Sequence, residues 1–222
     1  FEAGAAKRPI TPDPLLPISG GMGVPTQATS RQGELTVRVL AFRTPTETVA
    51  VVGLDLLGFP SVLGDRARAL VPRLAPDKIL IGVTHTHSAP DCYAFPDGKG
   101  GHTGSLEYMQ FVAVQTAAAI NEALDHLRPA ELRIASGETK GKIAYNYYAP
   151  DLYDRRAAVL QVRGTDGQPI GTLVNYAIHP EVLGSKQGIL SPDLAGPLYA
   201  ALEKSAGGVA VFMNGAQGGM VT

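Results

Sequence analysis

Two histidines in a His-Thr-His segment, His85 and His87, are the residues of this sequence best suited to chemistry. They follow the apolar run of residues 78–84, which is typical of a buried strand. Side chains two positions apart on an extended backbone point to the same side, so both imidazoles can reach one ion. Neutral imidazole suits Zn²⁺, and the chain has one cysteine, so nitrogen and oxygen donors are the available ligands. The pattern favours a metal or catalytic role; the alternative is that both side chains only form hydrogen bonds at a strand end.

Polar residues also follow other apolar segments, at points where strands are expected to end. Asp55 ends one such segment and Asn214 ends the last, while Asn175 and His179 close a third. Ligands of open α/β sheets bind beyond the carboxyl ends of the strands, so we expect these residues to meet the two histidines there. Asp55 and Asp193 are predicted to accept hydrogen bonds from the imidazoles and to fix their tautomers.

Strands and helices alternate along the sequence. The expected strands cover residues 34–43, 48–56, 78–84, 131–136, 157–163, 169–178 and 208–213, and the expected helices cover residues 61–74, 105–127 and 193–204. A strand, a helix and a strand within residues 48–84 form a βαβ crossover, which implies parallel pairing. We therefore predict an α/β fold with a mixed, largely parallel sheet flanked by helices, and a metal site at the carboxyl ends of the strands. Residues 1–222 are expected to form a single catalytic-type domain that is incomplete at its C-terminus, because the sequence stops directly after a glycine-rich turn.

Composition excludes several other classes of protein. Lys and Arg number 19 and Asp and Glu 20, and this net charge of -1 argues against a nucleic-acid partner, whose phosphates require basic residues. Cys92 is the single cysteine, so an intrachain disulfide is excluded, and we expect an inert thiol. The sequence begins at Phe1 instead of Met, as it would after removal of a secretory signal or after trimming, and we expect an extracellular or periplasmic location.

Several segments, in this order, resemble the motifs of the neutral/alkaline non-lysosomal ceramidases. THTHSAP at residues 84–90 resembles the family's THTHSGP, and NYAIH at residues 175–179 resembles its NWFAVH. The other matching segments are residues 1–12 with the "G...DITP" start, Met22-Gly23 with "MGY", residues 51–56 with "VFVSLDL", residues 191–196 with "SxDxxGY", and residues 219–222 with "GDVSP". The resemblance extends over essentially the whole chain.

The resemblance implies a zinc-dependent amidohydrolase that cleaves the N-acyl amide bond of a small-molecule or lipid-like, ceramide-like substrate. It places the zinc ligands at His85 and His179, and it places His87 beside the metal and the substrate. Thr222 falls at the position of the family's proposed nucleophile, a serine. The family's other ligands, a Glu and a Tyr, lie downstream of residue 222, so a C-terminal fragment or a second chain is expected to complete the site.

Departures from the family motif leave other functions open. Met220 and Thr222 replace the Asp and the Ser of "GDVSP", so we favour a water molecule activated by the metal over Thr222 as the nucleophile. The alternatives to a ceramidase-like amidase are another metallohydrolase of amide or ester substrates and an inactive binding module of the same fold.

Overall fold

The dominant element of the fold is an eight-stranded sheet with the strand order β11-β9-β8-β6-β1-β3-β4-β5. Its strands are β1 (Glu2–Pro9), β3 (Thr36–Arg43), β4 (Thr48–Leu54), β5 (Ile79–Val83), β6 (Arg128–Glu138), β8 (Arg156–Gly164), β9 (Pro169–Tyr176) and β11 (Val209–Asn214). The short strands are β2 (Ser30–Arg31), β7 (Tyr145–Asn146), β10 (Ile189–Leu190) and β12 (Met220–Val221), and the helices are α1 (Ser61–Ala69), α2 (Leu106–Asp125) and α3 (Ala195–Ala206). The computed structural model describes residues 1–21, 23–141 and 143–222. Met22, which begins one of the segments that resemble the ceramidases, lies outside the described residues.

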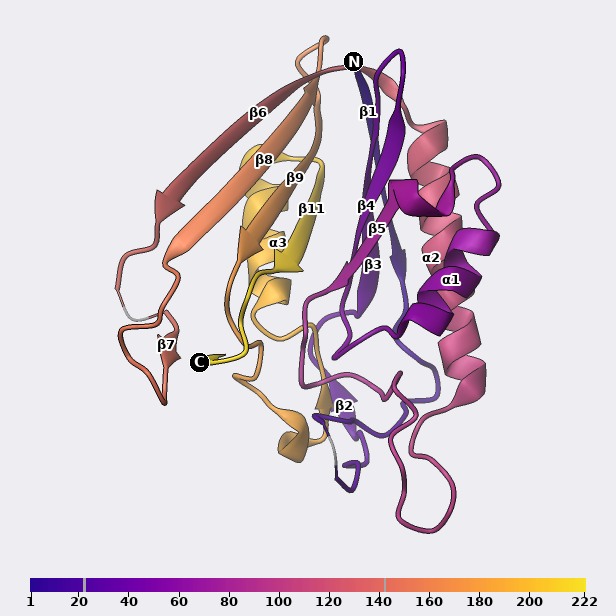
Figure 1. Cartoon of the computed structure of the whole chain (residues 1–222), viewed down its shortest axis with the longest axis vertical. Helices are drawn as coiled ribbons and strands as arrows, with labels where there is room; N and C mark the ends of the chain where they lie inside the picture. Colours follow the sequence, from indigo (N-terminus) through magenta and orange to yellow (C-terminus); the bar gives the residue numbers. More distant parts are fainter. Residues whose placement is uncertain (22, 142) are drawn as a thin grey trace.

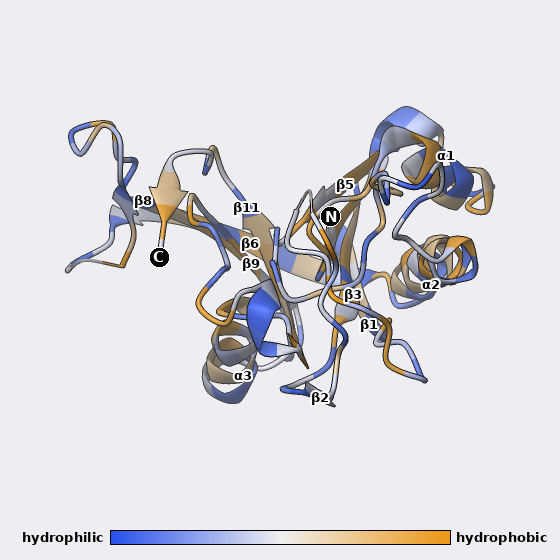
Figure 2. Cartoon of the chain, turned by 90° about the horizontal axis from the view of Figure 1, so that it is seen from below, coloured by the Kyte–Doolittle hydropathy of each residue, from blue (hydrophilic) through white to orange (hydrophobic). Residues whose placement is uncertain are grey.

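The sheet bends sharply at the junction of β1 and β6. These two strands share only two residue pairs, Glu2 with Pro129 and Ala3 with Arg128. The junction divides the sheet into a first half-sheet of β1, β3, β4 and β5 and a second half-sheet of β6, β8, β9 and β11. Helices α1 and α2 lie beside the first half-sheet and α3 lies beside the second (Figures 1 and 2). Strand β11 packs on β3, β4 and β5, so the molecule has four layers in the order helix, sheet, sheet, helix.

Helix α2 forms the largest core together with the first half-sheet. The Ser105 hydroxyl caps the helix by accepting the backbone N–H of Tyr108 at 3.2 Å. The apolar face of the helix packs Val112 and Ile120 against the sheet, where Val39 is fully buried. Each such side chain contributes about 1.5–3 kcal/mol when it leaves water. The resulting core fixes the direction of β5, the strand that leads into the His-Thr-His segment.

The expected mixed α/β fold is confirmed, but fewer of the neighbouring strand pairs are parallel than predicted. Only β4 with β5 and β9 with β11 are parallel within the eight-stranded sheet, and its other five neighbouring pairs are antiparallel. Strand β1 accounts for two of the five antiparallel pairs, because it lies between β3 and β6 and runs antiparallel to both. Its sequence, EAGAAKRP, has no β-branched or aromatic residue, so no strand was expected there.

The other predicted strands and helices are present, with shifted ends. Helix α1 stops at Ala69, because Pro72 cannot continue a helix and restricts the residue before it. Strands β8 and β9 form the predicted antiparallel hairpin. Among the residues that the structure describes, no helix has the length and apolar character needed to cross a membrane.

Candidate metal centre

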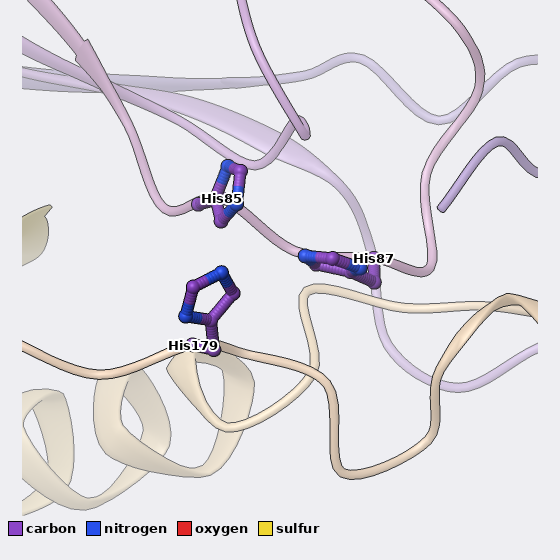
Figure 3. Close-up of side chains that lie close together, drawn as sticks. All are labelled: His85, His87 and His179. Atoms are coloured by element: carbon purple, nitrogen blue, oxygen red, sulfur yellow. The ribbon is translucent and has the colours of Figure 1, made fainter. Parts of the chain in front are cut away.

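Three imidazoles meet where the two half-sheets face each other. His85 and His87 follow β5 of the first half-sheet, and His179 follows β9 of the second (Figure 3). One nitrogen from each ring lies within 4.8 Å of the other two. The ring centroid of His85 lies 4.9 Å from those of both other rings, and the centroids of His87 and His179 are 5.5 Å apart. The pairing of the His-Thr-His segment with the distant His179 is therefore as predicted.

His85 is held by the loop that follows β4. Its backbone N–H donates to the carbonyl of Leu56 at 3.0 Å, and its Nδ1 lies 2.7 Å from the carbonyl oxygen of Leu57. A carbonyl accepts but cannot donate, so Nδ1 carries the proton and Nε2 presents its lone pair. The residue has φ of +68°, a left-handed conformation that is uncommon outside glycine. The extended backbone expected for the His-Thr-His segment is therefore absent at His85, and the left-handed conformation is stable only when its surroundings fix it.

His179 is held in the same manner by the last strand of the chain. Its backbone N–H donates to the carbonyl of Met220 at 2.7 Å, and its Nδ1 lies 3.2 Å from the same oxygen. The Nδ1 proton is fixed again, and Nε2 is left for a ligand. Thr222 is exposed and lies two residues beyond this carbonyl, so the segment that resembles the family's nucleophile motif is adjacent to the cluster.

His87 contributes a buried nitrogen without a partner. Its backbone N–H donates to the carbonyl of Pro180 at 3.0 Å, which ties it to the residue that follows His179. Its Nε2 is buried and has no hydrogen-bond partner among the described residues. A buried polar nitrogen without a partner is unfavourable, and a metal ion or a substrate group would relieve that penalty.

Burial keeps these imidazoles in the form that binds metals. Loss of solvent lowers the pKa of His87 to about 4, and the neighbouring His85 and His179 contribute to this decrease. Burial also lowers the pKa of His85 from its ordinary value. An imidazole must be neutral to coordinate an ion, so both residues are ready to bind at neutral pH. Three imidazole nitrogens within reach of one ion are donors that suit zinc, and the residues present fit such an ion.

Asp193 organises the loop behind the cluster instead of contacting an imidazole. Its carboxylate accepts the backbone N–H groups of Leu183 at 2.8 Å, Leu194 at 2.7 Å and Val182 at 3.3 Å. The predicted hydrogen bond to an imidazole is wrong for His85 and His179, whose Nδ1 atoms lie against the carbonyls of Leu57 and Met220, and Asp193 acts on His87 only through its charge. Asp193 instead holds the chain that leaves His179.

Asp55 also lies apart from the imidazoles. It is completely buried, and it accepts the backbone N–H of Thr36 at 2.9 Å, the Thr36 hydroxyl at 2.7 Å and the Tyr199 hydroxyl at 3.0 Å. The guanidinium of Arg38 stacks on the Tyr199 ring at 3.7 Å and donates to Glu203 at 2.6 Å. The predicted contact with an imidazole is wrong here too: Asp55 joins the first half-sheet to α3.

Asp55 is expected to make the stability of the protein depend on pH. Burial, opposed by the Thr36 and Arg38 contacts, raises its pKa from 3.8 to about 6. The folded state therefore holds a proton that the unfolded state releases, and stability falls as the pH rises from about 4 to about 6. The isosteric variant Asp55→Asn should remove this slope and gain on the order of 1–3 kcal/mol over the wild type between pH 4.5 and pH 7. Urea unfolding at both pH values measures the gain, with exposed Asp65→Asn as the control; parallel stability profiles for Asp55→Asn and wild type would contradict the assignment.

Three residues that the sequence singled out remain: Asn214 lies at the cluster, Asn175 is exposed, and Cys92 is buried. Asn214 lies between the strand ends that carry His85 and His179, and its amide donates to the carbonyls of Thr84 and Ile178. Asn175 is exposed, and its amide donates to the carbonyl of Met213 at 2.8 Å instead of to a residue of the cluster. Cys92 is buried, and desolvation raises the pKa of its thiol to about 12, so it is inert as expected.

The groups that orient His85 and His179 are backbone carbonyls, which the sequence does not predict. The oxygens of Leu57 and Met220 fix the two tautomers, and any residue type carries such an oxygen. The one available sequence signal is position: Leu57 follows a predicted strand, and Met220 lies in the segment that resembles the nucleophile motif.

Together the fold and the site define an α/β protein with a candidate three-histidine metal centre between two half-sheets. Among solved structures, the neutral ceramidase from Pseudomonas aeruginosa is similar to it, with a TM-score of 0.81 and 18% identity over 99% of this chain and 39% of its own. A ceramidase complexed with C2 is also similar, with a TM-score of 0.83 and 18% identity over 99% of this chain and 38% of its own. No protein-family model and no curated protein sequence matches this chain. The resemblance to the ceramidases is thus confirmed at the level of the fold, and the chain spans about two fifths of the length of these relatives.

Proposed function

We propose that this protein is a zinc-dependent hydrolase that cleaves the N-acyl amide bond of a lipid-like substrate. The observation that carries the proposal is the cluster itself: three imidazoles, two with their Nδ1 protons fixed, at strand ends of a fold that ceramidases share. Metal-binding histidines almost always donate their other ring N–H to a carbonyl, a carboxylate or a water molecule in this way.

Each histidine has a separate task in this proposal. His85 and His179 hold the ion through Nε2, since their other nitrogens are already engaged. When bound, zinc polarises a carbonyl oxygen and lowers the pKa of a water molecule toward 7. His87 has too low a pKa to be an effective base at neutral pH, so its lone pair serves as a third ligand or accepts a hydrogen bond from the substrate.

An exposed aromatic segment, which begins one strand away from the residue that holds His179, supports a lipid-like substrate. Strand β7 pairs with β12, the strand that holds His179, and the loop that follows β7 begins directly after Asn146, the residue paired with Met220. This loop exposes Tyr147 and Tyr148, with relative exposures of 66% and 90%. Tyrosine presents an apolar ring with a polar tip, which suits a surface that receives an acyl chain at its boundary with water.

The proposed activity is assigned to the longer protein that the similar structures suggest. This chain covers less than two fifths of their length, and we propose that residues outside 1–222, on the same chain or a second chain, complete the ligand set. His85, His87 and His179 would then form one wall of the site.

The test is release of the free amine from an N-acylated sphingoid base by the natural full-length protein. We expect hydrolysis that is lost when a chelator removes the metal and is restored by zinc, with His179→Ala close to background. The corresponding ester, assayed in parallel, separates an amidase from an esterase. Thr222→Ala should retain most turnover if a water molecule is the nucleophile and should lose it if the hydroxyl attacks. Amide hydrolysis that persists after chelation, or none with zinc restored, would contradict the proposal.

A further inference from the structure

We propose that Asn214 is a positioning residue of the metal centre: its side-chain amide ties the strand end before His85 to the strand end before His179. The inference rests on the proposed metal-binding function. The side chain of Asn214 bonds the backbone of Thr84 and Ile178 and not an imidazole, so it acts through the backbone that carries the histidines.

Every hydrogen-bonding group of this amide is engaged. The Nδ2 group donates to the carbonyl of Thr84 at 2.8 Å and to the carbonyl of Ile178 at 2.6 Å. The Oδ1 atom accepts the backbone N–H of Ile178 at 3.2 Å. Thr84 and Ile178 are buried and each immediately precedes a histidine of the cluster. A shift of this side chain would therefore move two proposed ligands relative to each other.

The amide also joins parts of the fold that the strand ladder does not connect. Thr84 follows β5 at one end of the eight-stranded sheet, whereas Asn214 ends β11 at the opposite end. These strands face each other across the two half-sheets and share no ladder hydrogen bonds. The contact to Thr84 thus fixes the separation of the half-sheets at the position where the imidazoles must meet.

The chemistry of the asparagine side chain matches these three contacts. An asparagine amide offers two N–H donors and one carbonyl acceptor, whereas an aspartate offers acceptors alone. In the isosteric variant Asn214→Asp, both donated bonds would be replaced by repulsion between the carboxylate and two carbonyls. The left-handed backbone of His85 immediately follows one of these bonds and depends on its surroundings to persist.

Asn175 provides a matched control within the same strand pair. It is paired with Met213 in the β9–β11 ladder, one position from the pair that contains Asn214. Its side chain is exposed and donates one bond, to the carbonyl of Met213. Asn175→Asp makes the same chemical change near the end of β9, but its side chain bonds only the carbonyl of Met213 and not the residues that immediately precede His85 or His179.

The first test compares the zinc affinities of Asn214→Ala, Asn214→Asp and Asn175→Asp by competition with a chromogenic chelator. We expect both Asn214 variants to bind zinc about 10- to 100-fold more weakly than the wild type, the range for loss of a residue that supports metal ligands. Asn175→Asp should stay within about twofold of the wild type, because its side chain supports no ligand. The visible spectrum of bound Co²⁺ should change in the Asn214 variants, because displaced ligands alter the coordination geometry. Folded Asn214 variants with wild-type affinity and an unchanged spectrum would overturn the proposal.

A second test needs no metal, and so separates failure of this inference from failure of the proposed function. In the metal-free wild type, NMR should show magnetisation transfer between the ring protons of His85 and His179, whose centroids are 4.9 Å apart. Asn214→Asp should weaken this signal while Asn175→Asp preserves it; an unchanged signal overturns the inference. If the Asn214 variants do not fold, hydrogen exchange in the wild-type protein replaces them. The side-chain amide protons of Asn214 should exchange slowly with solvent. Exchange as fast as that of the Asn175 amide would overturn the inference.

Discussion

Replacing His85 or His179 by alanine is expected to abolish zinc binding at micromolar metal. Each variant removes one of the two imidazoles whose Nδ1 is held by a backbone carbonyl and whose Nε2 is presented to the ion, and this leaves at most two nitrogen donors in the cluster. The loss of affinity should exceed the roughly 100-fold that removal of a supporting residue costs. Elemental analysis after dialysis and a zinc titration monitored by competition measure the effect. Both variants should remain folded, because each ring is only partly buried.

His87→Ala distinguishes a third ligand from a substrate contact. If the free Nε2 of His87 coordinates the ion, the variant should lose zinc as completely as the other two. If His87 serves the substrate, affinity should fall by about tenfold or less while turnover of the full-length protein falls further. His102→Ala is the control, since His102 is exposed in the loop before α2. Zinc retention by both His85→Ala and His179→Ala would show that the site assignment is wrong.

The sequence predicted this centre because its strong signals are local or positional. His85 and His87 are two residues apart, and His179 stands at the end of an apolar segment, so the rule that strand ends share an edge brought them together. The same rule grouped Asp55 with them incorrectly. A strand end specifies an edge of the sheet but not the layer that a side chain enters, and Asp55 turns toward α3 and Tyr199.

The sheet shows why the pairing of its strands is harder to predict from the sequence than the positions of the strands. Strands β4, β5, β9 and β11 contain apolar runs, whereas β1 consists of small and charged residues. Its strand conformation comes from pairing with β3 along its whole length, a tertiary effect that a local pattern does not carry. Strand β1 lies between β3 and β6, and therefore between the parallel pair β4–β5 and the parallel pair β9–β11. The sheet bends at the junction of β1 with β6. That bend places the ends of β5 and β9 opposite each other.

The close approach of the two half-sheets depends on Gly53, and Gly53→Val is expected to damage stability and metal binding together. A Cβ atom at this position of β4 would lie 2.8 Å from the carbonyl oxygen of Phe212 in β11 and 3.0 Å from a methyl carbon of Val211. The first atom belongs to a backbone that its own ladder fixes, so the strands must separate. Overpacking of this kind costs about 1–3 kcal/mol and occasionally more, and we expect a loss at or above the upper end.

Gly137→Val is the matched control for both expected effects of Gly53→Val, the loss of stability and the weaker metal binding. Gly137 lies in β6 with no atom within 4 Å of the position of an added Cβ, so valine should change stability by no more than about 0.5 kcal/mol there. Denaturant unfolding of both variants measures this contrast. His85 and His87 belong to one half-sheet and His179 to the other, so separation at Gly53 should also weaken zinc binding in the protein that remains folded. A Gly53→Val protein with the stability and zinc affinity of Gly137→Val would mean that the half-sheets do not meet as described, and that the three imidazoles are brought together by their loops alone.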